Sequence, residues 1–322
     1  MKKFVIKLVA VIMSASFALV GCKSGESQNN ENSSAKYSKL KVTASFYPMY
    51  DFSRKIGGDK VEVRNIISSN VEPHDWEPTP KDIVSIGESD VFVYNGVGME
   101  NWIDKVTKSS DNKNLELVEA SKGVKLLKGE EDEHNKDKKE DAHEHAHHGA
   151  YDPHVWLSPE NAKKEMENIK NAFVKADPKN KDYYEKNFKE NANKLDELDK
   201  KFKDELGKTN KKDIVVAHEA FGYICNTYGL NQVAIEGLSP DSEPDAGKMA
   251  EISKFAKDNK VKYIFFEELV SPKVAETIAK EVGAKTAVLN PIEGMTEKQL
   301  KAGEDYFSIM NKNLEVLLKA LN

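Results

Sequence analysis

From residue 40 to residue 96, apolar patterns that are typical of strands alternate with patterns that are typical of helices. Short runs in which apolar residues alternate with polar ones, or stand together, are typical of strands. Thr79, Pro80 and Asp82 form the expected start of a helix, with a capping hydroxyl, a proline in the first turn and an acid near the N-terminus. The resulting β-α-β-α-β order predicts a parallel sheet with covering helices. The predicted strands are residues 40–46, 61–67 and 90–96.

One uninterrupted helical pattern follows, from residue 183 to residue 206. Leu195, Leu198 and Phe202 recur every three to four residues, and Glu and Lys fill the other faces. We expect a helix over residues 181–207 that connects two lobes; the alternative is a surface helix of the first lobe. Beyond it the alternation restarts. The predicted strands there are residues 213–217, 233–236, 261–266 and 286–289, and the predicted helices are residues 221–228, 245–257, 271–283 and 310–321.

Together these patterns predict an α/β fold of two lobes, each with a mainly parallel sheet flanked by helices, joined by one long helix. The chain has 322 residues, and the part beyond its N-terminal segment is long enough for two domains of usual size. We expect the first lobe over residues 40–180 and the second over residues 208–322. Each predicted strand leads into a polar loop at its carboxyl end, where open sheets of this class bind ligands.

The N-terminal residues predict a targeting segment. Positive charges at residues 1–7 precede an apolar run, residues 8–20, that is too short to span a membrane comfortably. The ending Leu-Val-Gly-Cys resembles a lipoprotein box, in which the signal is cut before the cysteine and the thiol carries lipid. We therefore expect a signal peptide over residues 1–21, lipid on Cys22 and a disordered polar tether over residues 22–39. An ordinary signal peptide with a chance cysteine is the alternative.

Composition and charge narrow the class of protein. The chain is 39% hydrophobic and 32% charged, as in ordinary globular proteins, with a net charge of −6. Because no basic stripe is present, nucleic acid is not expected as a partner. Cys225, the second of two cysteines, stands in an apolar context and is expected to be a small buried residue rather than a nucleophile.

The histidines fall into two groups. His74, His154 and His218 each lie in a loop or just after a predicted strand, with carboxylates nearby in sequence. Zinc favours imidazole ligands, and a bound histidine usually donates its other N–H to such an acceptor. One such histidine alone is more often structural, but three in matching contexts indicate a preformed metal site. The neighbouring acceptors are Glu72, Asp75, Asp152 and Glu219.

The other histidines are crowded into residues 128–150, an acidic and almost wholly polar segment that predicts a solvated loop of the first lobe. We expect this His-rich loop to provide weak additional zinc sites, which capture zinc for the tight site or sense its excess. The alternative is a solvated insertion that binds metal only incidentally. In either case we expect the loop to be dispensable for the tight site. Its histidines are His134, His143, His145, His147 and His148.

Several motifs together make the chain resemble the zinc/manganese solute-binding proteins of bacterial ABC importers, and most closely their zinc branch. The resemblance runs from residue 40 to the end and implies two α/β lobes joined by one rigid helix, with the metal held in the cleft. The motifs are residues 44–52 (ASFYPMYDF), 73–80 (PHDWEPTP), 152–159 (DPHVWLSP), 216–223 (VAHEAFGY), 239–245 (SPDSEPD) and 289–294 (LNPIEG).

The same resemblance implies the ligand set. His74 and His154 correspond to first-lobe ligands and His218 to the second-lobe histidine. The family's fourth ligand is a carboxylate, often an aspartate, in the loop where this chain has Asn290. We therefore expect Glu293 to be the fourth ligand, with Glu267 or a water molecule as alternatives. Three imidazoles and one carboxylate suit tetrahedral Zn²⁺, whereas manganese-carrying relatives have two histidines and two carboxylates.

The implied function is that of a zinc receptor without enzymatic activity. It is expected to be an extracytoplasmic monomer that is anchored to the cell membrane by lipid, binds one Zn²⁺ tightly and delivers it to an ABC permease. We expect little lobe motion, with local ordering of residues 239–245.

Three alternatives to this function stay open. A manganese or broader divalent-metal receptor is the alternative within the family. A metallohydrolase would also use three histidines, but no H-E-x-x-H or similar motif is present. An adhesin is compatible with lipid anchoring, but no repeat or adhesive module is present, so it would be a secondary role.

Overall fold

The computed structural model describes residues 39–109, 112–129, 151–239 and 244–322. The expected signal peptide, the expected lipid attachment site Cys22, the expected tether as far as residue 38 and all five histidines of the His-rich loop lie outside these residues. Among the described helices, none is long and apolar enough to cross a membrane.

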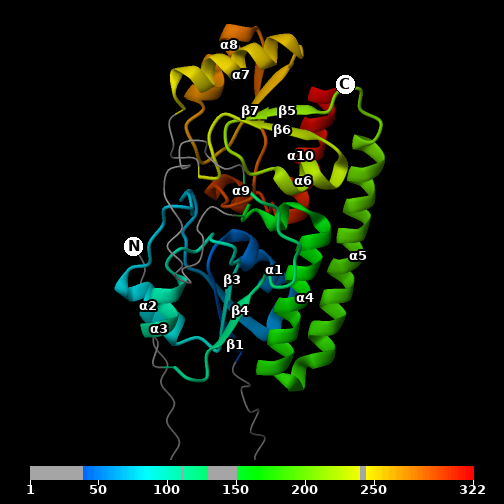
Figure 1. Cartoon of the computed structure of the whole chain (residues 1–322). Coiled ribbons are helices and arrows are strands. Elements are labelled where there is room, and N and C mark those ends of the chain that lie inside the picture. The colour runs from blue at the N-terminus through cyan, green and yellow to red at the C-terminus, as the bar shows by residue number, and fades with distance from the viewer. Residues whose placement is uncertain (1–38, 110–111, 130–150, 240–243) are drawn as a thin grey trace, which may run out of the picture. The chain divides into compact units, whose positions relative to one another are not determined.

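The first lobe is built on a four-stranded, fully parallel sheet with the strand order β2-β1-β3-β4. Strands β1, β3 and β4 of this sheet are labelled in Figure 1. Strands β1 and β3 are central and almost entirely buried, because helices cover the sheet. Helices α1 and α4 pack against one another and against the sheet. The bounds are β1 (Leu40–Ala44), α1 (Tyr47–Gly57), β2 (Val61–Asn65), α2 (Pro80–Gly87), β3 (Val91–Tyr94), α3 (Ile103–Ser109), β4 (Glu116–Glu119) and α4 (Pro159–Ala176).

The second lobe repeats this topology, with the parallel strand order β6-β5-β7-β8. Helices α7 and α8 pack on one another and enclose a small separate core around Ile252, Ile264 and Ile278. The bounds are β5 (Asp213–Val216), α6 (Gly222–Tyr228), β6 (Asn231–Ala234), α7 (Ala246–Asp258), β7 (Tyr263–Phe266), α8 (Lys273–Val282), β8 (Lys285–Val288), α9 (Glu297–Lys301) and α10 (Tyr306–Leu321).

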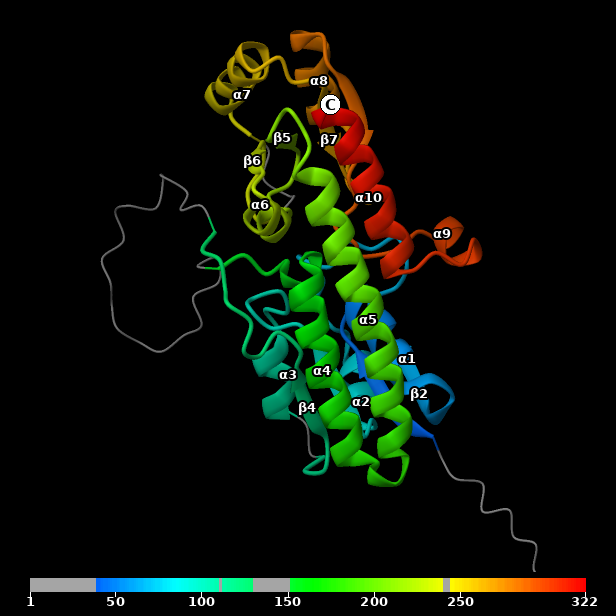
Figure 2. The same cartoon turned by 90° about the vertical axis from the view of Figure 1, so that its right-hand side faces the viewer.

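Helix α5 (Lys181–Leu206) runs past both lobes (Figure 2). It packs on α1 and α4 of the first lobe and on α6 and α10 of the second. Its buried stripe, which includes Leu195, Leu198 and Phe202, belongs to one hydrophobic core that contains residues from both sheets. The predicted connecting helix is therefore present, and the two lobes share a core rather than meeting across a solvated gap.

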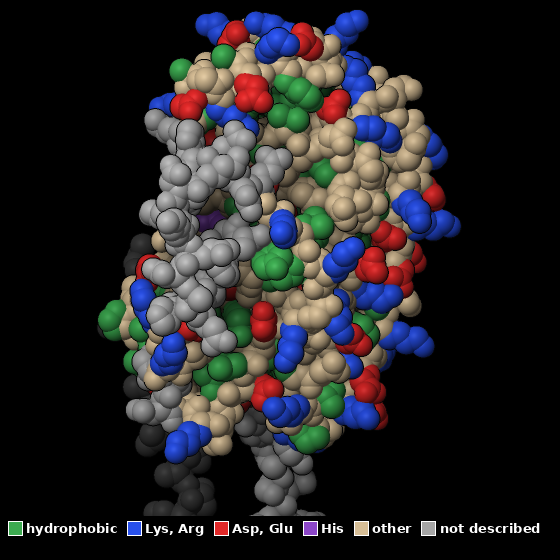
Figure 3. All heavy atoms as spheres, viewed as in Figure 1, with side chains coloured by type: hydrophobic (Ala, Val, Ile, Leu, Met, Phe, Trp, Pro, Cys, Tyr) green, Lys and Arg blue, Asp and Glu red, His purple; other side chains and the backbone are tan. Residues whose placement is uncertain are grey.

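Charged side chains of both signs are interspersed over the face shown in Figure 3, where Lys and Arg stand among Asp and Glu. This mixture agrees with the modest net charge of −6. Cys225 is a buried free cysteine, as its apolar context predicts.

Most differences from the predicted elements concern their ends. The first predicted strand reached residue 46, but β1 ends at Ala44 and Phe46 already stands at the N-cap position of α1. Helix α10 begins at Tyr306, four residues before the predicted start, because Asp305 and Ser308 form a capping box. The short elements α3, β4 and α9 were not predicted, because their residues have no clear pattern of apolar positions. In β4, for example, only Val118 is buried.

Candidate metal centre

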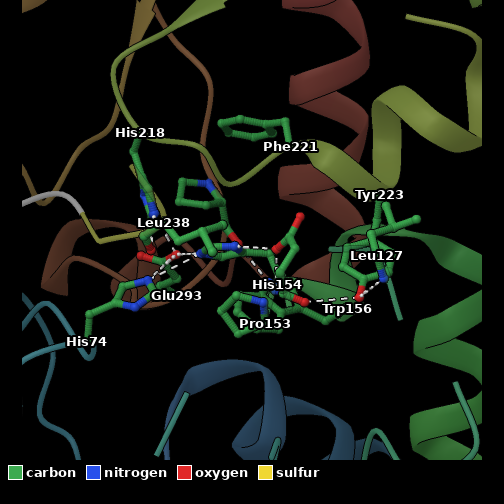
Figure 4. A network of polar contacts seen from close by, with 12 residues as sticks. His74, Leu127, Pro153, His154, Trp156, His218, Phe221, Tyr223, Leu238 and Glu293 are labelled. Carbon is green, nitrogen blue, oxygen red and sulfur yellow. Dashed lines mark hydrogen bonds and ion pairs between the residues drawn. The ribbon is translucent and has the colours of Figure 1, made fainter. Parts of the chain in front are cut away.

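Four side chains that are far apart in the sequence meet where the carboxyl ends of the two parallel sheets face each other. His74 lies in the loop between β2 and α2, and His154 immediately precedes a short 3-10 helix, η3 (Val155–Leu157). His218 follows β5 by two residues, and Glu293 lies in the loop after β8. One ligand atom from each of the four lies within 4.8 Å of all the others (Figure 4). The topology therefore assembles three imidazoles and one carboxylate.

The centre of the cluster has the spacing of a tetrahedral zinc site. Glu293 Oε1 lies 2.9 Å from His154 Nε2 and 3.3 Å from His74 Nε2, and the two Nε2 atoms are 3.2 Å apart. Bonds of about 2.0–2.1 Å to a tetrahedral Zn²⁺ place ligand atoms roughly 3.3 Å from one another. Three of the four donors thus already have nearly the separation that a zinc ion requires.

His218 is held by its other ring nitrogen. Its Nδ1 lies 2.7 Å from Glu267 Oε1, and its Nε2 lies 3.0 Å from the backbone carbonyl oxygen of Leu238. Glu267 occupies Nδ1, which also lies 3.9 Å from Glu293 Oε1, so Nε2 would bind a metal only if the ring gave up the Leu238 carbonyl and turned toward the ion. Glu267 thus stands behind His218, whereas Glu293 stands inside the cluster.

Asp152 orients His154. Its Oδ1 accepts from the backbone N–H of His154 at 2.9 Å and lies 2.7 Å from the ring Nδ1, which leaves Nε2 directed at the cluster. The loop of His74 is fixed differently, because Glu72 accepts the backbone N–H of His74, at 3.0 Å for each carboxylate oxygen. Carboxylates behind the histidines are typical of zinc sites, where they set the ring orientation.

Asn290 organises the loop that carries Glu293. Its side-chain Oδ1 accepts a hydrogen bond from the backbone N–H of Ile292 at 2.7 Å. Asn313 Oδ1 accepts from the backbone N–H of Asn290 at 2.9 Å, and Asn313 Nδ2 donates to the Asn290 carbonyl oxygen at 2.7 Å. Ile292 adopts φ 63°, a left-handed conformation that costs a β-branched residue about 1–3 kcal/mol. Such strain persists only where neighbouring contacts hold it, and here it directs Glu293 into the cluster.

Burial and mutual attraction set the charges of the site. The side chains of His74, His154, His218 and Glu293 are 9%, 0%, 1% and 3% exposed. Figure 3 shows a small area of histidine on this face. Burial alone would raise the pKa of Glu293, but attraction to His74 and His218 and the His154 contact hold it well below its usual value. The carboxyl group is therefore ionised and suited to a cation.

The histidine pKa values differ within the cluster. Burial lowers the pKa of His74, and Glu293 offsets this only in part. For His154, burial is outweighed by Asp152 and Glu293, which raise the pKa to about 8. For His218, Glu267 and Glu293 outweigh burial and raise the pKa to about 10. In the absence of metal, the protons on His154 and His218 therefore offset the negative charge of the carboxylates. A metal ion must displace these protons in order to bind.

Comparison with known proteins gives a consistent result. The family model for zinc-uptake complex component A, periplasmic (ZnuA), matches residues 42–320. The high-affinity zinc uptake system protein ZnuA of Bacillus subtilis is 47% identical over 310 residues, which cover 96% of each chain. The zinc-binding lipoprotein AdcA of Streptococcus pneumoniae strain R6 is 42% identical over 279 residues, covering 87% of this chain and 55% of AdcA. The chain thus spans about half of that longer relative.

This chain is also similar to a solved structure in three dimensions. The Zn(II)-bound ZnuA-like domain of Streptococcus pneumoniae AdcA has a TM-score of 0.75 and 39% identity to this chain. The similarity covers 88% of this chain and 99% of that domain. It therefore includes both lobes and the helix between them.

Proposed function

The chain belongs to the family of zinc-uptake complex component A, and on this premise we propose that it is a zinc receptor that delivers Zn²⁺ to an ABC permease. The observation that carries the proposal is the convergence of His74 Nε2, His154 Nε2 and Glu293 Oε1 at separations of 2.9–3.3 Å. That spacing suits a tetrahedral ion bound by nitrogen and oxygen. The similarity to a Zn(II)-bound domain supports the same metal.

In this proposal His74, His154 and His218 bind zinc through Nε2, and Glu293 is the fourth ligand. Glu267 is assigned to orienting His218. Three imidazoles favour zinc over manganese, because manganese prefers harder oxygen ligands. Four protein ligands also complete a tetrahedron and leave no position for an activated water, unlike the open sites of zinc hydrolases. The relatives compared above are named as zinc-uptake and zinc-binding proteins, which agrees with a receptor rather than an enzyme.

The cellular setting is proposed on the same basis. The family is described as periplasmic, and the pneumococcal relative is named a lipoprotein. These descriptions support a signal peptide over residues 1–21, lipid on Cys22 and a polar tether over residues 22–39. The receptor would then stand outside the cell membrane as a monomer and present both lobes, residues 40–180 and 208–322, to the permease. The His-rich loop would act as an accessory zinc collector.

A metal titration tests the proposal. Metal-stripped protein is titrated with Zn²⁺ and Mn²⁺ in competition with a chelator, in parallel with His218→Ala and with a variant that lacks residues 130–149. We expect one tight zinc site that is lost in His218→Ala and retained in the loop deletion. The proposed ligand set would be wrong if manganese bound as tightly as zinc, or if the tight site survived His218→Ala.

A further inference from the structure

We propose that Trp156, Tyr223 and Tyr306 are positioning residues that hold His154 at a fixed distance from Glu293 and thereby limit the size of the ion that the site accepts. These three side chains are called the His154 clamp below. None of them is a proposed ligand. The inference rests on the proposed zinc site and adds what makes that site selective.

Trp156 links the loop that carries His154 directly to the loop that carries Glu293. Trp156 Nε1 donates to the carbonyl oxygen of Pro291 at 2.7 Å. Trp156 lies two residues after His154, and Pro291 lies two residues before Glu293, so this bond spans the same gap as the two ligands. The indole is fully buried and packs edge-on against Phe46, with ring centroids 5.0 Å apart. Figure 4 shows Trp156 beside His154 and Pro153.

The two tyrosines hold the backbone on either side of His154. The Tyr223 hydroxyl, on α6, donates to the carbonyl oxygen of Asp152 at 3.0 Å. The Tyr306 hydroxyl, at the start of α10, donates to the carbonyl oxygen of Trp156 at 2.7 Å. Both rings are buried, at 3% and 0% exposure, so water does not compete for these bonds. The loop that presents His154 is therefore fastened at both ends to elements that follow α5.

Tyr223 is also fastened from a second side. Its hydroxyl accepts the backbone N–H of Leu127 at 3.2 Å, and the N–H of Asp152 donates to the carbonyl of Leu127 at 2.9 Å. An antiparallel bridge between Lys128 and Tyr151 continues this pairing. Asp152, whose carboxylate orients His154, therefore has little freedom to shift.

This geometry limits the size of the ion that can bind, because longer metal–ligand bonds require a larger separation between the ligand atoms. Glu293 Oε1 and His154 Nε2 are 2.9 Å apart, on the short side for tetrahedral zinc. A larger ion of the same charge, such as Cd²⁺, needs these atoms to move apart. Loops joined through Trp156 and Pro291 resist that movement, whereas unfastened loops would permit it. The clamp should therefore favour zinc over larger ions.

Variants that each remove one hydrogen-bond donor test the clamp, and the two tyrosine variants do so without creating a large cavity. Tyr223→Phe and Tyr306→Phe each delete a single donor to the His154 loop, and Trp156→Phe deletes the indole donor. Tyr228→Phe is the matched control, since Tyr228 lies on the same helix as Tyr223 but its hydroxyl donates to Asp199 at 2.8 Å. Zn²⁺ and Cd²⁺ affinities are measured by competition on purified, metal-stripped protein, with thermal unfolding as a check of folding.

We expect the two tyrosine variants to bind zinc about tenfold more weakly, in the range found when outer-shell partners are removed. The preference for Zn²⁺ over Cd²⁺ should fall in these two variants and in Trp156→Phe, while Tyr228→Phe keeps the wild-type preference. If folded Tyr223→Phe and Tyr306→Phe proteins keep the wild-type ratio of the two affinities, the clamp does not control ion size. Failure of the wild-type protein to bind zinc tightly would instead overturn the proposed function and this inference with it.

Discussion

Glu267 Oε1 lies 2.7 Å from Nδ1 of His218, although the two residues are 49 positions apart in the chain. Both side chains are buried, with 4% and 1% exposure. The pair is a carboxylate–histidine contact of the kind that stands behind zinc ligands, where it fixes the ring and raises its basicity. Glu267 and Glu293 are therefore expected to respond differently to substitution.

Glu267→Ala should weaken zinc binding by about tenfold to a hundredfold, because the ring of His218 loses its orienting acceptor. Glu267→Gln keeps an acceptor oxygen and should lose less. Glu293→Ala removes a ligand and should lose more than either. Chelator competition on metal-stripped protein measures all three, with Glu251→Gln on the exposed face of α7 as the control. A larger loss in Glu267→Ala than in Glu293→Ala would exchange the two assigned roles.

Zinc affinity should rise with pH and fall as the solution becomes acidic. The raised pKa values of His154, about 8, and His218, about 10, mean that both are protonated at neutral pH without metal. Zinc binds only the neutral rings, so binding at pH 7 should release about one to two protons per ion. His74, whose pKa is lowered, should contribute none. Titration calorimetry in buffers of different ionisation enthalpy measures the release; heats that do not depend on the buffer would contradict it.

Removing zinc should lower the melting temperature without unfolding the protein. The shared core and the His154 clamp hold the lobes together in the absence of an ion. Zinc at about 1,000 times its Kd should add roughly 4 kcal/mol to the free energy of unfolding. Thermal melts with zinc, and with zinc followed by excess chelator, measure this change. His218→Ala should show almost no zinc-dependent shift, and an equal shift in that variant would point to stabilisation by another site.

Phe202→Ala should destabilise the whole described fold by about 3–5 kcal/mol, because it leaves a cavity in a core common to both lobes. Phe202 is fully buried on α5, and its ring centroid lies 5.2 Å from that of Tyr228. Denaturant unfolding followed by fluorescence measures the loss, with the exposed Lys203→Ala as the control. We expect a single transition that moves to lower denaturant. Two separated transitions would show that the lobes unfold independently.

The local sequence was sufficient to predict those helices and strands whose ends and buried face are specified by their own residues. Thr79, Pro80 and Asp82 predicted the start of α2, and the observed helix begins at Pro80 with a capping box between Thr79 and Asp82. The apolar stripe of α5 predicted a connecting helix to within a residue at each end. Strand β4 was not predicted, because a four-residue edge strand with one buried side chain has too little pattern to distinguish it from a loop.

The sequence by itself determined the classes of donor in the site and the motifs that hold them. His74, His154 and His218 could be selected because each stands in a polar loop beside an element end, and Glu293 because it follows Asn290 in a recognisable motif. Only the tertiary structure decided which carboxylate enters the cluster and which stands behind a ring. Glu293 and Glu267 both follow strands, and their roles depend on the register of β5, β7 and β8 across a parallel sheet. The Trp156–Pro291 bond likewise joins residues 135 positions apart. Contacts of that span depend on how separate elements pack, and no local pattern encodes them.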